Sequence, residues 1–296
     1  MDGNERRSAA DHTGHDRQLC KATMTPVRRF SLSELLIVAG LSAVAAGAVA
    51  YRVFAPPVDA GPTPGERMDV ATGEQTVFLF RSREELAPLE RRYGPGHFSR
   101  YVEEWVARDF FSDRRGGVFL DVGAGHYRNE NNTFYLEKEL GWSGLAVDAL
   151  PEYEADYRAH RPRTTFIAVF ASDVDDSSVR LFEPQHDKRI TSASEAFTLQ
   201  KGERGKARQV PTATLGRLLN QAGLDKIDYM SMDIELAEPK ALAGFDIRRY
   251  QPRLVCIETH PEVRQQIFDY FARNGYVVVG KYLRIDPTNV YFQPLR

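Results

Sequence analysis

Val118-Phe-Leu-Asp-Val-Gly-Ala-Gly-His126 is the stretch that decides the fold of this chain. An apolar run ends here on the carboxylate of Asp121 and passes directly into a glycine-rich turn. Further along, Leu145-Ala-Val-Asp148 is a second apolar run that ends on a carboxylate. In a parallel α/β sheet, glycines after one strand let the backbone approach a ligand, and an acid after the next strand binds ribose hydroxyls. The pair predicts a site for an adenosine-containing cofactor.

The glycine-rich turn supplies the candidate cofactor residues Asp121, Gly123, Ala124 and Gly125, and Asp148 is the candidate for the ribose. An ordinary tight turn between a strand and a helix would have a similar sequence. The prediction of a cofactor site therefore depends on the spacing between this turn and Asp148. A dinucleotide fingerprint has a third glycine that allows close helix packing near the pyrophosphate. Arg128 stands at that position here, which disfavours a nicotinamide cofactor.

Strand-like apolar runs alternate with helical patterns from about residue 72 onward. Strands are expected over 118–122, 145–147, 165–170, 227–232, 254–258, 276–282 and 289–292. Helices are expected over 83–92, 97–111, 132–140, 152–160, 214–222, 237–245 and 262–274. Only a turn separates the last two strands, so they should pair antiparallel. The pattern predicts an α/β fold, with a Rossmann-like, mostly parallel sheet, helices on both faces and an antiparallel C-terminal hairpin.

The net charge of the 296 residues is −2, which gives no sign of a nucleic-acid-binding surface, since such surfaces are usually strongly basic. Cys20 lies in a polar segment and Cys256 in a strand-like run, so a structural disulfide between these two cysteines is not expected. Two sulfurs are also too few for a thiolate metal site.

The N-terminal part differs from an ordinary soluble enzyme. Residues 1–34 are a polar tail that we expect to be disordered, and residues 35–52 are a weakly apolar run. This run predicts a single-pass transmembrane anchor or signal-like segment, with the side of the membrane left open, and a buried soluble helix is the remaining alternative. Residues 53–71 are a Pro/Gly linker, and 72–296 are the folded domain.

Further polar side chains follow the later strands. Ser172 and Asp173 come after the third strand, where they would flank an adenine ring or cap a turn. Asp233 and Glu235 follow the fourth strand and are expected at the crevice. Pro239 fits the first turn of the next helix.

Two titratable groups, Glu258 and His260, end the fifth strand and suggest an acid–base pair. His126, just past the glycine-rich turn, is a weaker candidate for the site lining. No metal site is predicted, although Asp233 and Glu235 offer the carboxylates that hard cations prefer.

These residues together resemble the FkbM-type family of S-adenosylmethionine-dependent methyltransferases, which have the class I methyltransferase fold. The resemblance runs from about residue 118 to 290. It is carried by the following motifs: Phe119-Leu-Asp-Val-Gly-Ala-Gly125, Asn132-Thr-Phe-Tyr-Leu-Glu-Lys-Glu-Leu-Gly-Trp-Ser-Gly144, Ile227-Asp-Tyr-Met-Ser-Met-Asp-Ile-Glu235 and Cys256-Ile-Glu-Thr-His260.

The resemblance implies methyl transfer from S-adenosylmethionine to a hydroxyl oxygen of a small molecule or sugar. In the family pattern, Asp121, Gly123 and Gly125 would line the cofactor and Asp148 would hold its ribose. The transfer site would be surrounded by Asp233, Glu235, Glu258 and His260. An alcohol acceptor needs a base, and we expect His260 or Asp233 to take the proton while Glu258 orients the base.

The chain departs from the family pattern at two positions. Asp148 stands where members usually have Glu, which shortens the reach by one methylene. Leu236 stands where they usually have Gly, and its side chain predicts an altered or closed acceptor site. The acceptor itself would be set by the N-terminal helices and by residues 177–210, a polar stretch that predicts an insertion or hairpin beside the site.

Two alternatives stay open at this point. The first is a nicotinamide-dependent oxidoreductase on a similar sheet. The second is a non-catalytic, membrane-tethered binding module that keeps the fold. The expected partners are a small-molecule or sugar acceptor and a membrane, bound through residues 35–52, and no nucleic acid is expected.

Overall fold

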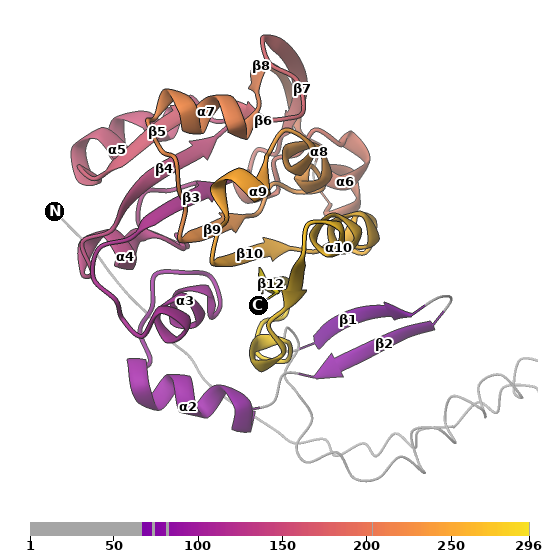
Figure 1. The fold of residues 1–296 in the computed structure, drawn as a ribbon. Coiled ribbons are helices and arrows are strands. Elements are labelled where there is room, and N and C mark those ends of the chain that lie inside the picture. Colours follow the sequence, from indigo (N-terminus) through magenta and orange to yellow (C-terminus); the bar gives the residue numbers. More distant parts are fainter. Residues whose placement is uncertain (1–66, 73–74, 81–82, 203, 296) are drawn as a thin grey trace, which may run out of the picture. The chain divides into compact units, whose positions relative to one another are not determined.

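The computed structural model describes residues 67–72, 75–80, 83–202 and 204–295 (Figure 1). The predicted tail over 1–34, the apolar run over 35–52 and most of the predicted linker lie outside the described residues. Strand β1 (Arg67–Thr72) begins inside the range expected to be linker and pairs antiparallel with β2 (Gln75–Phe80).

The expected membrane anchor needs a correction. Among the helices of the described residues, none is both long and apolar enough to cross a bilayer. The segment on which the expectation rested, 35–52, is not part of the described structure.

A seven-stranded sheet forms the centre of the fold, in the order β11-β12-β10-β9-β3-β4-β5. Five neighbouring strands run parallel: β3 (Val118–Val122), β4 (Ser143–Asp148), β5 (Thr164–Ala168), β9 (Tyr229–Met232) and β10 (Leu254–Glu258). The last two strands, β11 (Tyr276–Val278) and β12 (Asn289–Pro294), pair antiparallel with each other, and β12 pairs antiparallel with β10. This confirms the predicted mostly parallel sheet with an antiparallel C-terminal hairpin.

Helices cover both faces of the sheet because each central strand is apolar on both sides. Leu120 and Val122 point into a core with α7 (Leu215–Gln221), α8 (Glu238–Ala243), α9 (Ile247–Tyr250) and α10 (Arg264–Arg273). Phe119, on the other face of the same strand, packs against helices that come earlier in the chain. These earlier helices are α2 (Arg83–Tyr93), α3 (Glu103–Phe111) and α4 (Phe134–Lys138).

One further helix, α5 (Glu154–His160), follows the short 3₁₀ turn Pro151–Tyr153 and packs Tyr157 against Ala146 of β4. Residues 276–282 were expected to be one strand, but β11 ends at Val278 and a 3₁₀ turn (Gly280–Tyr282) follows.

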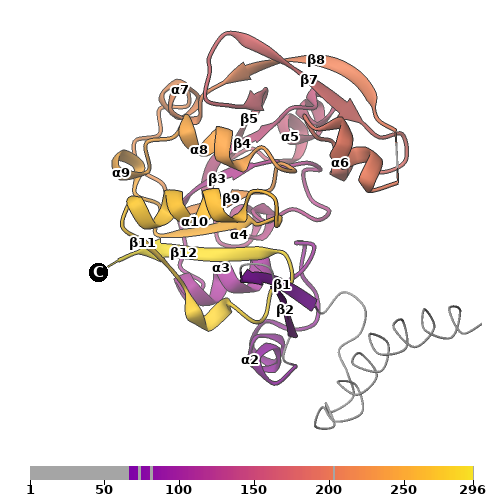
Figure 2. The same cartoon turned by 90° about the vertical axis from the view of Figure 1, so that its right-hand side faces the viewer.

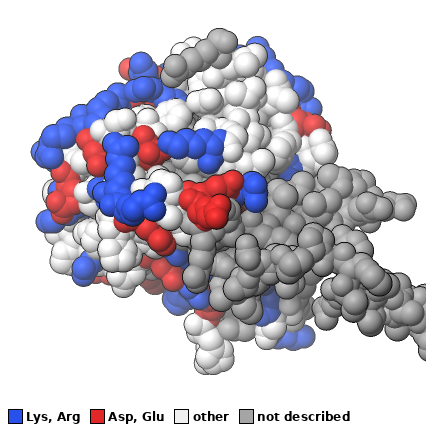
Figure 3. Space-filling view, turned by 90° about the horizontal axis from the view of Figure 1, so that it is seen from below, with Lys and Arg blue, Asp and Glu red and all other residues white. Residues whose placement is uncertain are grey.

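Residues 177–210 form the expected hairpin beside the main sheet. Strands β7 (Ser177–Glu183) and β8 (Lys206–Ala213) pair antiparallel, and β8 also pairs with the short β6 (Phe170–Ala171). A 3₁₀ turn (Lys188–Ile190) and α6 (Glu195–Gln200) lie between β7 and β8. Figure 2 shows this hairpin and α6 projecting beyond the central sheet. On the face in Figure 3, acidic and basic side chains are interspersed among uncharged residues.

The strand order reverses between β3 and β9, which are neighbours in the sheet although β4 follows β3 in the chain. In open α/β sheets, ligands bind beyond the carboxyl ends of the strands at such a switch point. Because β3 ends in the glycine-rich turn and β9 is followed by Asp233, the fold brings both predicted motifs to this one place.

Candidate functional site

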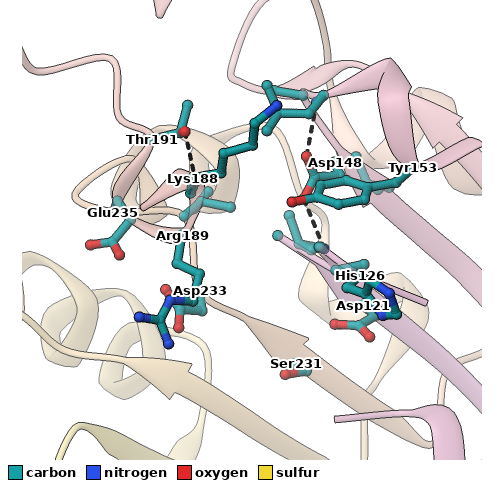
Figure 4. Close-up of a pocket in the computed structure, with 18 of the residues that line it drawn as sticks. Asp121, His126, Asp148, Tyr153, Lys188, Arg189, Thr191, Ser231, Asp233 and Glu235 are labelled. Carbon is teal, nitrogen blue, oxygen red and sulfur yellow. Dashed lines mark hydrogen bonds between the residues drawn. The ribbon is translucent and has the colours of Figure 1, made fainter. Parts of the chain in front are cut away.

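A cavity of about 370 Å³ lies at the switch point. This volume is in the range of small-molecule sites, which is roughly 300–1,000 Å³. Of the predicted site residues, Asp121, Gly123, Ala124, Gly125, His126, Asp148, Asp233 and Glu235 line it. Figure 4 shows Asp121, His126 and Asp148 on one side of the cavity and Asp233 and Glu235 on the other.

Gly123 allows the turn after β3 to pack directly on the segment after β9. Its φ is +82°, and a Cβ placed there would lie 1.8 Å from the backbone oxygen of Asp233. The glycine therefore serves the approach of two backbone segments. At Gly125, φ is +56°, but a Cβ there would meet no atom within 4 Å.

Asp148 is held with its carboxylate facing the cavity. Its Oδ1 accepts a hydrogen bond from the amide of Leu150 at 2.8 Å, and Oδ2 accepts one from the amide of Gly125 at 2.9 Å. Burial raises the pKa of Asp148 to about 6 and outweighs these two bonds, which favour the charged form. Each oxygen of the carboxylate keeps a lone pair for a ligand hydroxyl.

Asp121 is buried at the base of the cavity, where a polar network fixes it. Oγ1 of Thr133 donates to its Oδ2 at 2.8 Å, and the Arg161 guanidinium donates to Thr133 and to Glu137. Burial raises the pKa of Asp121 to about 6, and Thr133 and Arg161 act in the opposite direction.

Ser172 and Asp173 lie away from this cavity. Among the described residues, neither lies on the cavity wall; Ser172 Oγ instead donates to Asp173 Oδ1 at 3.0 Å. Strand β5 ends at Ala168, and the chain then turns to pair β6 with β8. The cavity wall near Asp148 instead includes apolar side chains: Leu150, Tyr153, Val169, Phe170 and Ala171.

His126 lines the cavity with a fixed ring. Its Nδ1 accepts hydrogen bonds from the amides of Arg128 at 3.1 Å and Asn129 at 3.0 Å, so the proton of the neutral ring is on Nε2. The ring also stacks on Tyr127, with 4.6 Å between the centroids.

His260 lies between two carboxylates at the other end of the site. Its Nε2 is 2.9 Å from Glu258 Oε2 and 3.2 Å from Glu235 Oε2. These three residues, which we call the His260 cluster, come from the ends of two neighbouring strands, β9 and β10. Within the described part of the chain, Glu235 reaches the cavity wall, whereas Glu258 and His260 do not.

The charge of His260 differs from what a general base requires. Burial disfavours its charged form, but the contacts with Glu235 and Glu258 outweigh burial and raise the pKa of His260 to about 10. The imidazole is therefore protonated at neutral pH and cannot accept a proton. Its protonation, together with its position behind Glu235, disfavours His260 as the base. Asp233, which lies on the cavity wall, is the remaining candidate.

Asp233 is half-buried and faces other acids. Burial raises its pKa well above the ordinary value, and the negative charges of Glu258 and Glu235 raise it further. In its ionised form, a carboxylate with a raised pKa binds an incoming proton more tightly than an exposed carboxylate does.

Several residues of the cavity wall were missed by sequence reasoning. Asn132 Nδ2 donates to Ser231 Oγ at 2.9 Å across the floor, and Arg189 pairs with Glu130 at 2.9 Å at the rim. Arg189 comes from the hairpin insertion, whose sequence has no readable motif. The missed residues are Arg100, Glu103, Val122, Asn129, Glu130, Asn132, Val147, Ala149, Leu150, Tyr153, Lys188, Arg189, Thr191 and Ser231, with the apolar residues of 169–171, Leu181 and Ile234.

Leu236 has the left-handed backbone that favours glycine, with φ at +79°. Its side chain packs partly against the core of α7–α10, and among the described residues the cavity wall includes Glu235 but not Leu236. The side chain therefore does not close this cavity, and its predicted effect on the acceptor site stays a prediction. The backbone of Leu236 is nevertheless strained, because a leucine rarely adopts a positive φ.

This strain predicts an unusual order of stability for two variants. Leu236→Gly and Leu236→Ala lose nearly the same packing, but only glycine relieves the left-handed conformation. We expect the glycine variant to be more stable by about 1 kcal/mol, the reverse of the usual order. Urea unfolding of both variants measures the difference, and an alanine variant at least as stable as the glycine variant would contradict it.

The His260 cluster predicts a pH-dependent contribution to stability. The pKa of His260 is about 10 in the folded state and 6.5 when unperturbed, so folding is coupled to proton binding between these values. The stabilisation is complete below pH 6.5 and is lost as the pH rises through 10. The free-energy difference between wild type and His260→Gln, measured by urea unfolding, should shrink over this range. A constant difference would show that the imidazolium does not form.

Comparisons with known proteins bear on this site. The family described as "Methyltransferase FkbM domain" matches residues 121–278. No curated protein matches the sequence.

Among solved structures, the chain is similar to a TehB-like SAM-dependent methyltransferase from Corynebacterium glutamicum, at 15% identity over 72% of this chain and 97% of that chain, with a TM-score of 0.39. It is also similar to a SAM-dependent O-methyltransferase from Thermotoga maritima, at 10% identity over 79% and 78% of the two chains, with a TM-score of 0.36. The assignment of the fold rests on the strand order described above.

Proposed function

The chain belongs to the FkbM methyltransferase family and uses S-adenosylmethionine, and from this premise we propose that it methylates a hydroxyl oxygen of a small molecule or sugar. The observation that carries the proposal is the division of the cavity. Asp148 and the apolar residues around it form one side, and the carboxylates of Asp233 and Glu235 form the other.

The residues of the cavity fit this cofactor. The Asp148 carboxylate, fixed by two backbone amides, can accept hydrogen bonds from both ribose hydroxyls. Leu150, Val169 and Phe170 offer an apolar slot for the adenine ring. Asp121 supplies negative charge for the cationic methionine part. These assignments replace Ser172 and Asp173 and retain Gly123, Ala124 and Gly125 as the turn that shapes the site.

The bound cofactor supplies a methyl group on a positively charged sulfur, and the C–S bond breaks as the acceptor oxygen forms its bond to carbon. The protein must align the acceptor with this bond and remove the hydroxyl proton. We assign the proton to the Asp233 carboxylate. In this proposal Glu235 lies beside the acceptor, and His260, protonated, holds Glu235 in place together with Glu258.

Transfer of a labelled methyl group tests the proposal. The full chain is incubated with radiolabelled S-adenosylmethionine and matched panels of alcohols, sugars and amines. We expect label in hydroxyl acceptors, recovered as methyl ethers that resist alkaline hydrolysis. Label confined to amines would refute O-methylation. Cofactor binding without transfer to any acceptor would favour the non-catalytic binding module.

A further inference from the structure

The His260 cluster has the spacing of a metal-ligand set. One ligand atom from each of Glu235, Glu258 and His260 lies within 4.8 Å of the other two. The two distances from Nε2 are 2.9 Å and 3.2 Å. Adjacent ligands of an octahedral ion with bonds of about 2.1 Å are about 3 Å apart, so these side chains need little rearrangement to share one cation.

We propose that Glu235, Glu258 and His260 bind one divalent first-row transition-metal cation, such as Mn²⁺ or Zn²⁺, beside the acceptor end of the cavity. The donor set selects this class of ion. Imidazole nitrogen suits transition metals, whereas Mg²⁺ and Ca²⁺ prefer sites made of oxygen alone. The cation takes the place of the proton that Nε2 carries between the two carboxylates.

A buried acid next to the cluster supplies independent support. Glu238 is fully buried, and its Oε1 accepts from the amide of Ile234 at 3.0 Å. Its Oε2 is buried too, but accepts no hydrogen bond from any residue that the structure describes. The charge of Glu238 interacts with the charges of Glu258 and His260, so its carboxyl group lies near the same cluster.

The charges around the cluster favour a cation with more than one positive charge. Asp233, Glu235, Glu238 and Glu258 provide four carboxyl groups, and His260 provides one positive charge among them. Lys201 also acts on Glu235, but its side chain lies on the surface. Buried charges need partners, and a divalent ion compensates these acids better than a single imidazolium.

The position of the metal site suggests a role for the ion in methyl transfer. This role rests on the proposed function. Glu235 belongs both to the cluster and to the cavity wall, so an ion bound to it lies next to the acceptor. A divalent ion that binds the acceptor oxygen lowers the pKa of that hydroxyl. The hydroxyl proton then passes to Asp233, and the oxygen keeps the electron pair that forms the new bond.

Metal binding is tested on the full chain without any acceptor. The protein is freed of metal with a chelator, and Mn²⁺ is titrated while electron paramagnetic resonance reports the free ion. We expect one Mn²⁺ per chain, and at least about 10-fold weaker binding in both Glu258→Gln and His260→Gln. Glu262→Gln, an exposed neighbour of the cluster, is the matched control and should bind like wild type.

Three outcomes would overturn the proposal: no saturable binding of Mn²⁺ or Zn²⁺, equal affinity in wild type and both cluster variants, or Mg²⁺ binding as tight as Mn²⁺. Titration of S-adenosylhomocysteine into each variant reports whether it is folded. Since this readout needs no turnover, a failed metal site and a failed methyl-transfer proposal are told apart.

Discussion

Asp233→Asn should lower the rate of methyl transfer by roughly 100- to 10,000-fold, the usual contribution of a general base. The amide has the shape of the carboxylate but cannot accept the proton of the hydroxyl. Asp233 is also the acid that faces the cavity directly after β9, at the point where the strand order reverses. Single-turnover measurements with a labelled cofactor give the rate for wild type and variant.

The control for this variant is Asp173→Asn. Asp173 was predicted to belong to the site, but it is exposed and lies off the cavity wall described here, so its amide should leave the rate unchanged. Both variants should bind S-adenosylhomocysteine within about 3-fold of wild type, a difference below 1 kcal/mol. A rate in Asp233→Asn close to that of wild type would remove Asp233 from its assigned role.

Gly123→Ala should destabilise the fold by about 2–5 kcal/mol. The new methyl group would lie 1.8 Å from the Asp233 backbone oxygen, and the residue would keep a φ of +82°. Overpacking of this kind costs about 1–3 kcal/mol, and a left-handed non-glycine residue adds about 1–2 kcal/mol. The backbone oxygen cannot move aside without displacing the whole segment after β9. Urea unfolding measures the loss.

Gly125→Ala is the matched control, two residues away in the same turn. Its φ is also positive, but its Cβ would meet no atom within 4 Å. Only the cost of the left-handed backbone remains, so we expect the free energy of unfolding to fall by about 1–2 kcal/mol. Equal losses in the two variants would mean that the turn does not pack on the segment after β9.

The glycine-rich turn and the acids at the strand ends could be predicted from the sequence, because both are local patterns. An apolar run followed by Asp121 or Asp148 marks the end of a buried strand, and parallel strands end at the same edge. The strand order then brings Asp121, Asp148 and Asp233 to one cavity.

The role of His260 could not be predicted in this way. Its charge depends on Glu235 and Glu258, which come from different strands and meet only in the folded chain. Glu258 alone, two residues before His260, suggested an acid–base pair. The second carboxylate stabilises the imidazolium and turns the predicted base into a positively charged partner of both acids.

The cavity wall proposed to hold the adenine ring also depends on long-range strand pairing. The run 165–170 was predicted to be one strand, but the chain divides it between β5 and β6, and β6 pairs with β8 of the insertion. This pairing places Val169 and Phe170 on the wall and Asp173 in solvent. Arg189 likewise reaches the rim through the fold of the insertion. No local sequence pattern predicts the conformation of this insertion.

Calorimetric titration of S-adenosylhomocysteine into wild type and Asp148→Ala most directly tests whether the cavity at the switch point is the cofactor site. We expect wild type to bind one molecule per chain. Loss of charge-assisted hydrogen bonds, worth about 1.5–3 kcal/mol, should weaken binding in the variant by roughly 10- to 150-fold. Undiminished affinity in Asp148→Ala would place the cofactor elsewhere and contradict the account.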